Sequence, residues 1–168
     1  MKISMHQASV ATMVRALNNL AAVLEKGALH CEAKKIDPAV MVNARLYPDM
    51  LPLSKQVQIA SDTAKAGAAR LAGMEPPSYP DNEATLGELI ERARKTVKYL
   101  ETLRPEQMEG AEDRTVTWKA GEQTRSMQGM PYLLNRVLPN VFFHCATAYG
   151  ILRHNGVEIG KQDFLGKL

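Results

Sequence analysis

The clearest helical pattern in the chain lies in residues 131–155, PYLLNRVLPNVFFHCATAYGILRHN. At about 100° per residue, apolar positions recur on one side of this segment. They are Leu133, Val137, Ala148 and Ile151. Pro131 suits an early helical position, and Asn155-Gly156 is a stop signal. The segment therefore predicts a long final helix that packs one face against a core.

The same side of this helix also carries polar residues. Asn140, His144 and Thr147 fall within the apolar stripe, and buried polar groups are usually hydrogen-bonded. His144 therefore fits two interpretations. It is either a core histidine bonded to a neighbouring helix, or a residue that lines a buried site as metal ligand, base or hydrogen-bonding group. Pro139 should displace the carbonyl of Asn135 and kink the helix beside these residues.

Three further segments show helical periodicity. The first covers residues 4–24 and continues over 28–34 if Gly27 does not end it, and the second covers residues 51–72. A third begins at the capping-box pattern Thr85-x-x-Glu88. Four long helices with short connections predict an all-α fold, a four-helix up-down bundle, in a single domain over residues 1–168.

One short segment before the last helix has a β pattern instead. Residues 115–119 are β-branched and alternating, Gly121 follows in a turn, and residues 123–127 provide a partner strand. We therefore expect a small β-hairpin insertion that rests on the helices through Trp118, because an isolated hairpin is only marginally stable.

Composition excludes several classes of protein. The 168 residues carry 21 basic and 18 acidic side chains, interspersed, with three Phe and one Trp, so no basic stripe with aromatics points to nucleic acid. No apolar run is long enough for a membrane span. Two isolated cysteines, Cys31 and Cys145, and the lack of a signal peptide favour free thiols and a cytoplasmic protein.

The basic residues of the third helix have a simple explanation. Glu88 and Glu91 each precede a basic residue by four positions, which is the favourable order for ion pairs on a helix surface. The basic residues are Arg92, Arg94, Lys95 and Lys98. We therefore interpret them as a solvated face rather than a phosphate site.

Sequence motifs for catalysis are absent. The chain has no H-E-x-x-H, no Glu-x-x-His pair, no Cys-x-x-Cys and no G-x-S-x-G. Cys145 follows His144 directly, but neighbouring helical residues point about 100° apart, so the two do not form a dyad. Asp49 precedes the second helix and fits a helix cap better than a metal ligand.

Three stretches carry a resemblance to known proteins. They are residues 45–57 (RLYPDMLPLSKQV), 110–112 (GAE) and 143–166 (FHCATAYGILRHNGVEIGKQDFLG). They resemble a bacterial family of uncharacterised proteins, which in turn resembles the DinB/YfiT-like metalloenzyme superfamily. That resemblance implies a four-helix bundle, often dimeric, with three histidines that hold a divalent metal, and with thiol-dependent transferases among related branches.

The residues of that implied metal site are mostly replaced here. Gln56 stands near the expected position on the second helix, and Asn140-x-x-x-His144 replaces a histidine pair on the last. One histidine of three remains, and amides are weak ligands for Zn or Ni. The resemblance therefore implies a pocket more strongly than a metal.

Three functions follow as hypotheses, and the sequence leaves open whether the protein is an enzyme. The leading one is a small-ligand-binding protein with a degenerate or absent metal site, whose pocket is lined by Gln56, Asn140, His144 and Thr147. The alternative is a hydrolase or thiol transferase that holds a divalent metal, Zn or Ni, through His144 and a carboxylate, Asp49 or Asp62. The third is a structural homodimer without a ligand.

Overall fold

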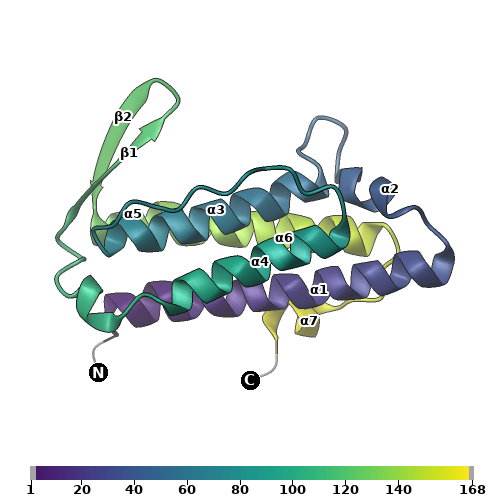
Figure 1. Ribbon diagram of the computed structural model, residues 1–168, viewed down its shortest axis with the longest axis horizontal. Coiled ribbons are helices and arrows are strands. Elements are labelled where there is room, and N and C mark those ends of the chain that lie inside the picture. The colour runs from purple at the N-terminus through teal and green to yellow at the C-terminus, as the bar shows by residue number, and fades with distance from the viewer. Residues whose placement is uncertain (1–2, 167–168) are drawn as a thin grey trace.

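The computed structural model describes residues 3–166 and shows a mostly helical protein with one two-stranded sheet (Figure 1). Residues 1–2 and 167–168 of the predicted single domain lie outside the described residues. The long helices are α1 (Thr12–Lys34), α3 (Leu53–Leu71), α4 (Leu86–Glu101) and α6 (Leu138–His154). The short helical segments are η1 (Gln7–Ala11), α2 (Pro38–Asn43), η2 (Pro105–Met108), α5 (Gly129–Tyr132), η3 (Leu133–Val137) and α7 (Lys161–Leu165).

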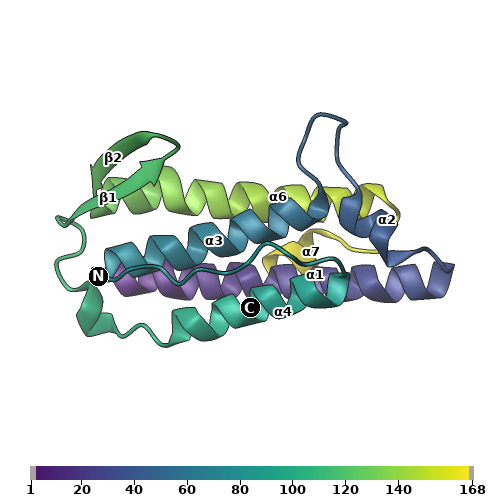
Figure 2. The same cartoon turned by 45° about the horizontal axis from the view of Figure 1, so that its top comes forward.

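The four long helices lie side by side around one apolar core (Figures 1 and 2). Helix α1 contacts α4 and α6, and α3 contacts the same two helices from the other side. The side chains between them are buried, as the apolar periodicity of each helix predicts. Representative core residues are Leu17, Leu24, Val57, Ala64, Leu89, Leu100, Val141 and Ile151. Within residues 3–166, no helix has the length and apolar character that crossing a membrane would require.

The connection between α3 and α4 differs from the predicted up-down order. Residues 72–85 run back along the molecule (Figure 1), so the two helices start at the same end. At that end Gln58 donates a hydrogen bond to Glu83 at 2.8 Å, and at the other Gln107 lies 3.3 Å from the Met74 sulfur. Helices α3 and α4 therefore run parallel, and the predicted up-down order of the bundle is wrong for this pair.

The physical reason is the length of the connecting segment. Residues 72–85 can span up to about 46 Å when extended, whereas α3 is only about 28 Å long. Prolines in this stretch, including Pro76, Pro77 and Pro80, keep it out of a helix. The sequence marks this segment as a loop but does not show that it returns along the whole helix.

The final helix starts earlier than predicted and changes its winding. Segments α5, η3 and α6 follow one another without a break from Gly129 to His154, and η3 is a turn of π-helix. Pro139 lies in the first turn of α6, directly after this π-turn. A wider turn makes room for the proline ring beside the carbonyl of Asn135, with which it would clash in a regular α-helix.

Two glycines allow the helices to approach closely. Helix α1 continues through Gly27 to Lys34, where a Cβ on Gly27 would lie 2.8 Å from the Leu152 side chain. A Cβ on Gly67 of α3 would lie 2.5 Å from Val137. Helix α1 therefore does not end at Gly27. The close contact between α1 and α6 requires glycine here, because a larger residue would clash with Leu152.

The predicted hairpin is confirmed. Strands β1 (Thr115–Ala120) and β2 (Gln123–Gln128) pair antiparallel, with Trp118 opposite Arg125. Gly121 in the turn has a φ of 63°, which glycine adopts without strain. The Trp118 ring lies 5.1 Å from the Tyr132 ring of α5, so Trp118 connects the hairpin to the helices as expected.

Candidate functional site

The structure brings together two of the four candidate pocket residues, Gln56 and His144. Gln56 lies on α3 and His144 on the antiparallel α6, and His144 Nδ1 is 2.7 Å from Gln56 Oε1. The two residues are only 2% and 8% exposed. A hydrogen bond between two buried polar side chains joins the helices at a defined register.

The hydrogen bonds around Gln56 also fix the tautomer of His144. Gln56 Nε2 donates a hydrogen bond to the Leu51 carbonyl at 2.9 Å. The amide oxygen of Gln56 must therefore face His144 and accept from it. Nδ1 of His144 then carries the proton, and Nε2 carries a lone pair.

Nε2 of His144 is the reactive atom of this arrangement. No hydrogen bond to it is formed by residues 3–166, and it is not among their fully enclosed unpaired polar atoms. Burial lowers the pKa of the His144 imidazole from its ordinary value of 6.5. At neutral pH the group is therefore an uncharged imidazole with an available acceptor nitrogen. The centroid of the Phe143 ring lies 5.2 Å from that of the imidazole, in an edge-to-face arrangement.

The other two candidate residues have separate partners. Asn140 donates to Thr63 Oγ1 at 3.0 Å, and Thr147 donates to the Phe143 carbonyl of its own helix at 2.8 Å. Asn140 lies one turn before His144, and Thr63 lies two turns after Gln56. The α3–α6 contact thus holds two polar pairs in succession, and Thr147 contributes to neither.

Sequence reasoning misses Thr63 and Leu51. Thr63 follows Gln56 by seven residues, so it lies on the same face of α3, and the antiparallel order of α3 and α6 places it opposite Asn140. That spacing is a usable signal once the helix pairing is known. The sequence could not predict the role of Leu51, because the group that binds Gln56 is its backbone carbonyl and every residue has one.

The residues around His144 do not fit a three-ligand metal centre. In the part of the chain that the structure describes, no group of three or more His, Cys, Asp or Glu side chains could hold a metal ion. The neighbours of His144 are amides and aromatics, which are weak ligands or none. Asp62 faces α4 and binds Arg92 and Lys65, on a different side of α3 from Gln56. Asp49 does not cap α3, whose N-cap is Pro52.

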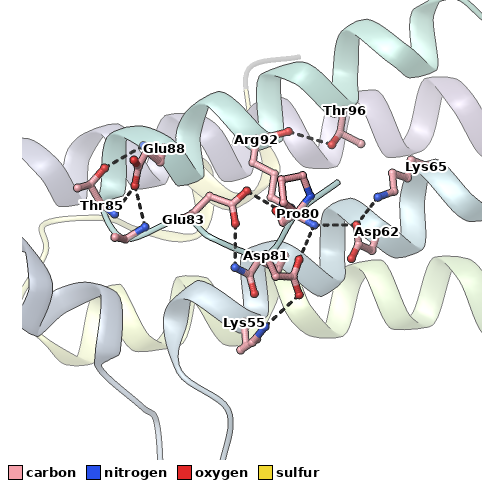
Figure 3. Close-up of polar contacts among 12 residues, drawn as sticks. Lys55, Asp62, Lys65, Pro80, Asp81, Glu83, Thr85, Glu88, Arg92 and Thr96 are labelled. Atoms are coloured by element: carbon pink, nitrogen blue, oxygen red, sulfur yellow. Dashed lines mark hydrogen bonds and ion pairs between the residues drawn. The ribbon is translucent and has the colours of Figure 1, made fainter. Parts of the chain in front are cut away.

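A second polar cluster lies between α3, α4 and residues 72–85, and Figure 3 shows it. We call it the Arg92 cluster: Asp62, Lys65, Asp81, Glu83 and Arg92. Arg92 is 3% exposed and contacts Asp62 at 2.8 Å, Asp81 at 3.0 Å and Glu83 at 2.8 Å. It also donates to the Pro80 carbonyl at 2.9 Å.

Arg92 therefore does not belong to a solvated face, and that prediction is wrong for this residue. Its expected partner Glu88 instead accepts from the backbone N–H of Ala84 and Thr85, which completes the predicted capping box. Burial alone would raise the pKa of the Glu83 carboxyl, but hydrogen bonds from Arg92 and Gln58 outweigh it and lower that pKa. The cluster attaches the returning segment to α3 and α4, which is a structural role.

Comparison with known proteins identifies the family. Residues 5–165 match the family model described as Domain of unknown function (DUF1993). The chain belongs to this family. Among solved structures, a DinB family member protein from Shewanella denitrificans is 38% identical, with a TM-score of 0.91. The match covers 98% of this chain and 93% of that one. No curated protein matches the chain.

The comparison confirms the resemblance expected from the sequence. The DUF1993 chain is a DinB-like protein, and its mostly helical fold is shared along nearly its whole length with the Shewanella protein. A shared fold does not determine the chemistry of a site, which depends on the residues that this chain places there.

Proposed function

We propose that this protein binds a small molecule at His144, with Nε2 as the acceptor of a hydrogen bond from the ligand. The observation that supports the proposal is the Gln56–His144 pair, which leaves Nε2 uncharged and without a partner among residues 3–166. Gln56 acts as a positioning residue, because it holds the ring and its tautomer as an outer partner does for a functional histidine.

The surroundings of His144 restrict the ligand chemistry. An uncharged, buried imidazole favours a neutral O–H, N–H or S–H donor over an anion. Phe143 is 56% exposed beside it and offers an aromatic edge to an apolar part of the ligand. We therefore expect a small alcohol, phenol, amine or thiol with an apolar body. The four long helices that carry this site form, on this proposal, a bundle of the DinB/YfiT-like type.

A matched pair of probes tests this proposal. Phenol donates a hydrogen bond, whereas anisole has the same ring and lacks the donor. In protein labelled with ¹⁵N, we expect phenol to shift the His144 Nε2 resonance saturably and anisole to leave it unchanged. His144→Gln should abolish the response, and Arg153→Gln, at an exposed position near the end of α6, is the control on the same helix. Equal shifts from both probes, or none from either, would reject the proposed acceptor role.

Metal analysis separates this function from the metal-dependent alternative. The alternative is a hydrolase or thiol transferase with Zn or Ni on His144. Untagged protein should contain substoichiometric Zn and Ni, and its melting temperature should not change with EDTA. Tight metal binding would raise stability by about 2.7 kcal/mol at a hundredfold excess over its dissociation constant. Stoichiometric metal that His144→Ala removes would therefore favour the alternative.

We also propose that the protein is a homodimer. Large apolar side chains are exposed on the last helix and on the loop that precedes α3, and a second copy would cover them. They are Leu46, Tyr47, Leu51, Leu134, Phe142 and Phe143. Light scattering should give twice the monomer mass, and Phe142→Lys should give the monomer. A monomeric wild-type protein at micromolar concentration would reject the dimer.

The free, buried cysteines fit the cytoplasmic location expected from the sequence.

A further inference from the structure

A groove of about 680 Å³ lies between the β-hairpin and the segments η3 and α6, and its lining does not include His144 or Gln56. Trp118, Arg125 and Ser126 line it from the hairpin, and Arg136 and Asn140 line it from η3 and α6. Every polar residue that lines it is either cationic or uncharged, so the groove has a net positive charge.

Within residues 3–166, no carboxylate pairs with either of the two arginines of this groove. Arg136 lies over the Trp118 ring at 4.8 Å, and Arg125 contacts only the Gln123 amide oxygen at 3.3 Å. Among the described residues, the side chain of neither arginine forms another hydrogen bond or an ion pair. By contrast, Arg92 binds three carboxylates, and the exposed Arg94 binds Glu25 at 2.5 Å. Arg125 and Arg136 therefore keep their donors available.

Trp118 supplies a second, independent observation. It is only 6% exposed, and its enclosed indole Nε1–H makes no hydrogen bond with any residue that the structure describes. A buried donor without an acceptor destabilises the protein, and such groups usually indicate a missing partner. The residue belongs to the wall of the groove that also holds both arginines.

We propose that this groove binds the oxyanion group of a small molecule, a carboxylate or a phosphate. Guanidinium groups donate two parallel hydrogen bonds to such groups, and the stacked Arg136 is already held in place by the indole ring. The site is separate from His144, which accepts a neutral donor, so each proposal can fail without the other.

Intrinsic fluorescence measures binding in this groove directly, because Trp118 is the only tryptophan in the chain. The probes are inorganic phosphate and acetate, each titrated at constant ionic strength, with sodium chloride as the control. We expect a saturable change in Trp118 emission with at least one probe, and the stronger probe identifies the preferred oxyanion. Arg125→Gln and Arg136→Gln should each weaken binding by about tenfold or more.

Arg94→Gln is the matched control, because it removes the same charge from an exposed helix position outside the groove. It should leave the titration unchanged. Helical circular dichroism and thermal melts confirm that each variant is folded. No saturable change with either probe, the same change with chloride, or binding that survives both groove substitutions would overturn the proposal.

Discussion

Gln56 on α3 and His144 on α6 are 88 positions apart in the sequence and joined by a hydrogen bond of 2.7 Å. The bond sets the register of two antiparallel helices and also determines which nitrogen of the imidazole is available. If the proposed function holds, stability and ligand binding thus depend on the same contact. Removing Gln56 would leave a buried nitrogen unpaired, at a cost of about 1–3 kcal/mol.

The first prediction concerns pH and His144. Burial lowers the pKa of this imidazole below 6.5 in the folded protein, so the unfolded chain binds the proton more readily at mildly acidic pH. The contribution of His144 to stability is therefore complete above pH 6.5 and is lost as the pH falls through the folded pKa. The free energy of unfolding should decrease by up to about 1.4 kcal/mol per pH unit for this single proton.

Urea unfolding between about pH 5 and 7.5 measures this effect. The range lies above the region where the lowered pKa values of Asp81 and Glu83 matter. His144→Gln cannot titrate, so its stability should depend less on pH than that of the wild type. Identical pH dependence in both proteins would show that His144 is not buried as a neutral ring.

The second prediction concerns the Arg92 cluster. Arg92→Met removes the cation that three carboxylates share, and we expect unfolding free energy to fall by about 2–4 kcal/mol. Asp62 and Asp81 are half-exposed, so water can solvate their charges when Arg92 is removed. The loss of unfolding free energy should therefore lie toward the lower end of this range. Arg94→Met breaks an exposed pair and should cost less than about 1 kcal/mol. Urea melts of the two variants test the difference, and equal losses would contradict the structural role of Arg92.

The third prediction uses two helical glycines. Gly67→Ala places a methyl group 2.5 Å from Val137 in the α3–η3 contact and should destabilise the protein by about 1–3 kcal/mol. In the exposed first turn of α4, the nearest atom to a Cβ on Gly87 is Thr85 Oγ1 at 3.8 Å. Gly87→Ala should therefore stabilise the protein by about 0.5 kcal/mol. Thermal melts distinguish the two, and a neutral Gly67→Ala would mean that the helices are further apart.

The fourth prediction concerns the two thiols. Burial raises the pKa of Cys145 to about 12 and also raises that of Cys31. Because the thiolate is the reactive form, neither should react with Ellman's reagent in the native protein at pH 8. Both should react in guanidinium chloride. Rapid modification of Cys145 in the native state would instead indicate a reactive thiol beside His144.

The predicted helices follow from local sequence patterns. The apolar spacing of residues 131–155 correctly places Val137, Ala148 and Ile151 in the core, and the Thr85 capping box correctly starts α4. The hairpin with Trp118 is predicted because β-branched alternation and a glycine turn lie within a few residues of each other. Such signals are local, and local signals are what a single sequence contains.

What sequence cannot provide is the partner of each polar residue. His144 is predicted to lie in the core, but its bond to Gln56 depends on which helices pack together. The spacing of Glu88 and Arg92 predicts an exposed pair, yet the returning segment brings Asp81 and Glu83 over Arg92 and buries it. In both cases a tertiary contact overrides a local preference.

The protonation of His144 is the most direct test of the central claim, that Gln56 holds this residue as a neutral imidazole with an available Nε2. Two-bond ¹H–¹⁵N correlation spectra at pH 7, assigned with His144→Gln, report the state of both ring nitrogens. We predict the neutral tautomer protonated at Nδ1, with the shift of an unprotonated acceptor at Nε2. A ring protonated at Nε2, or at both nitrogens, would contradict the account.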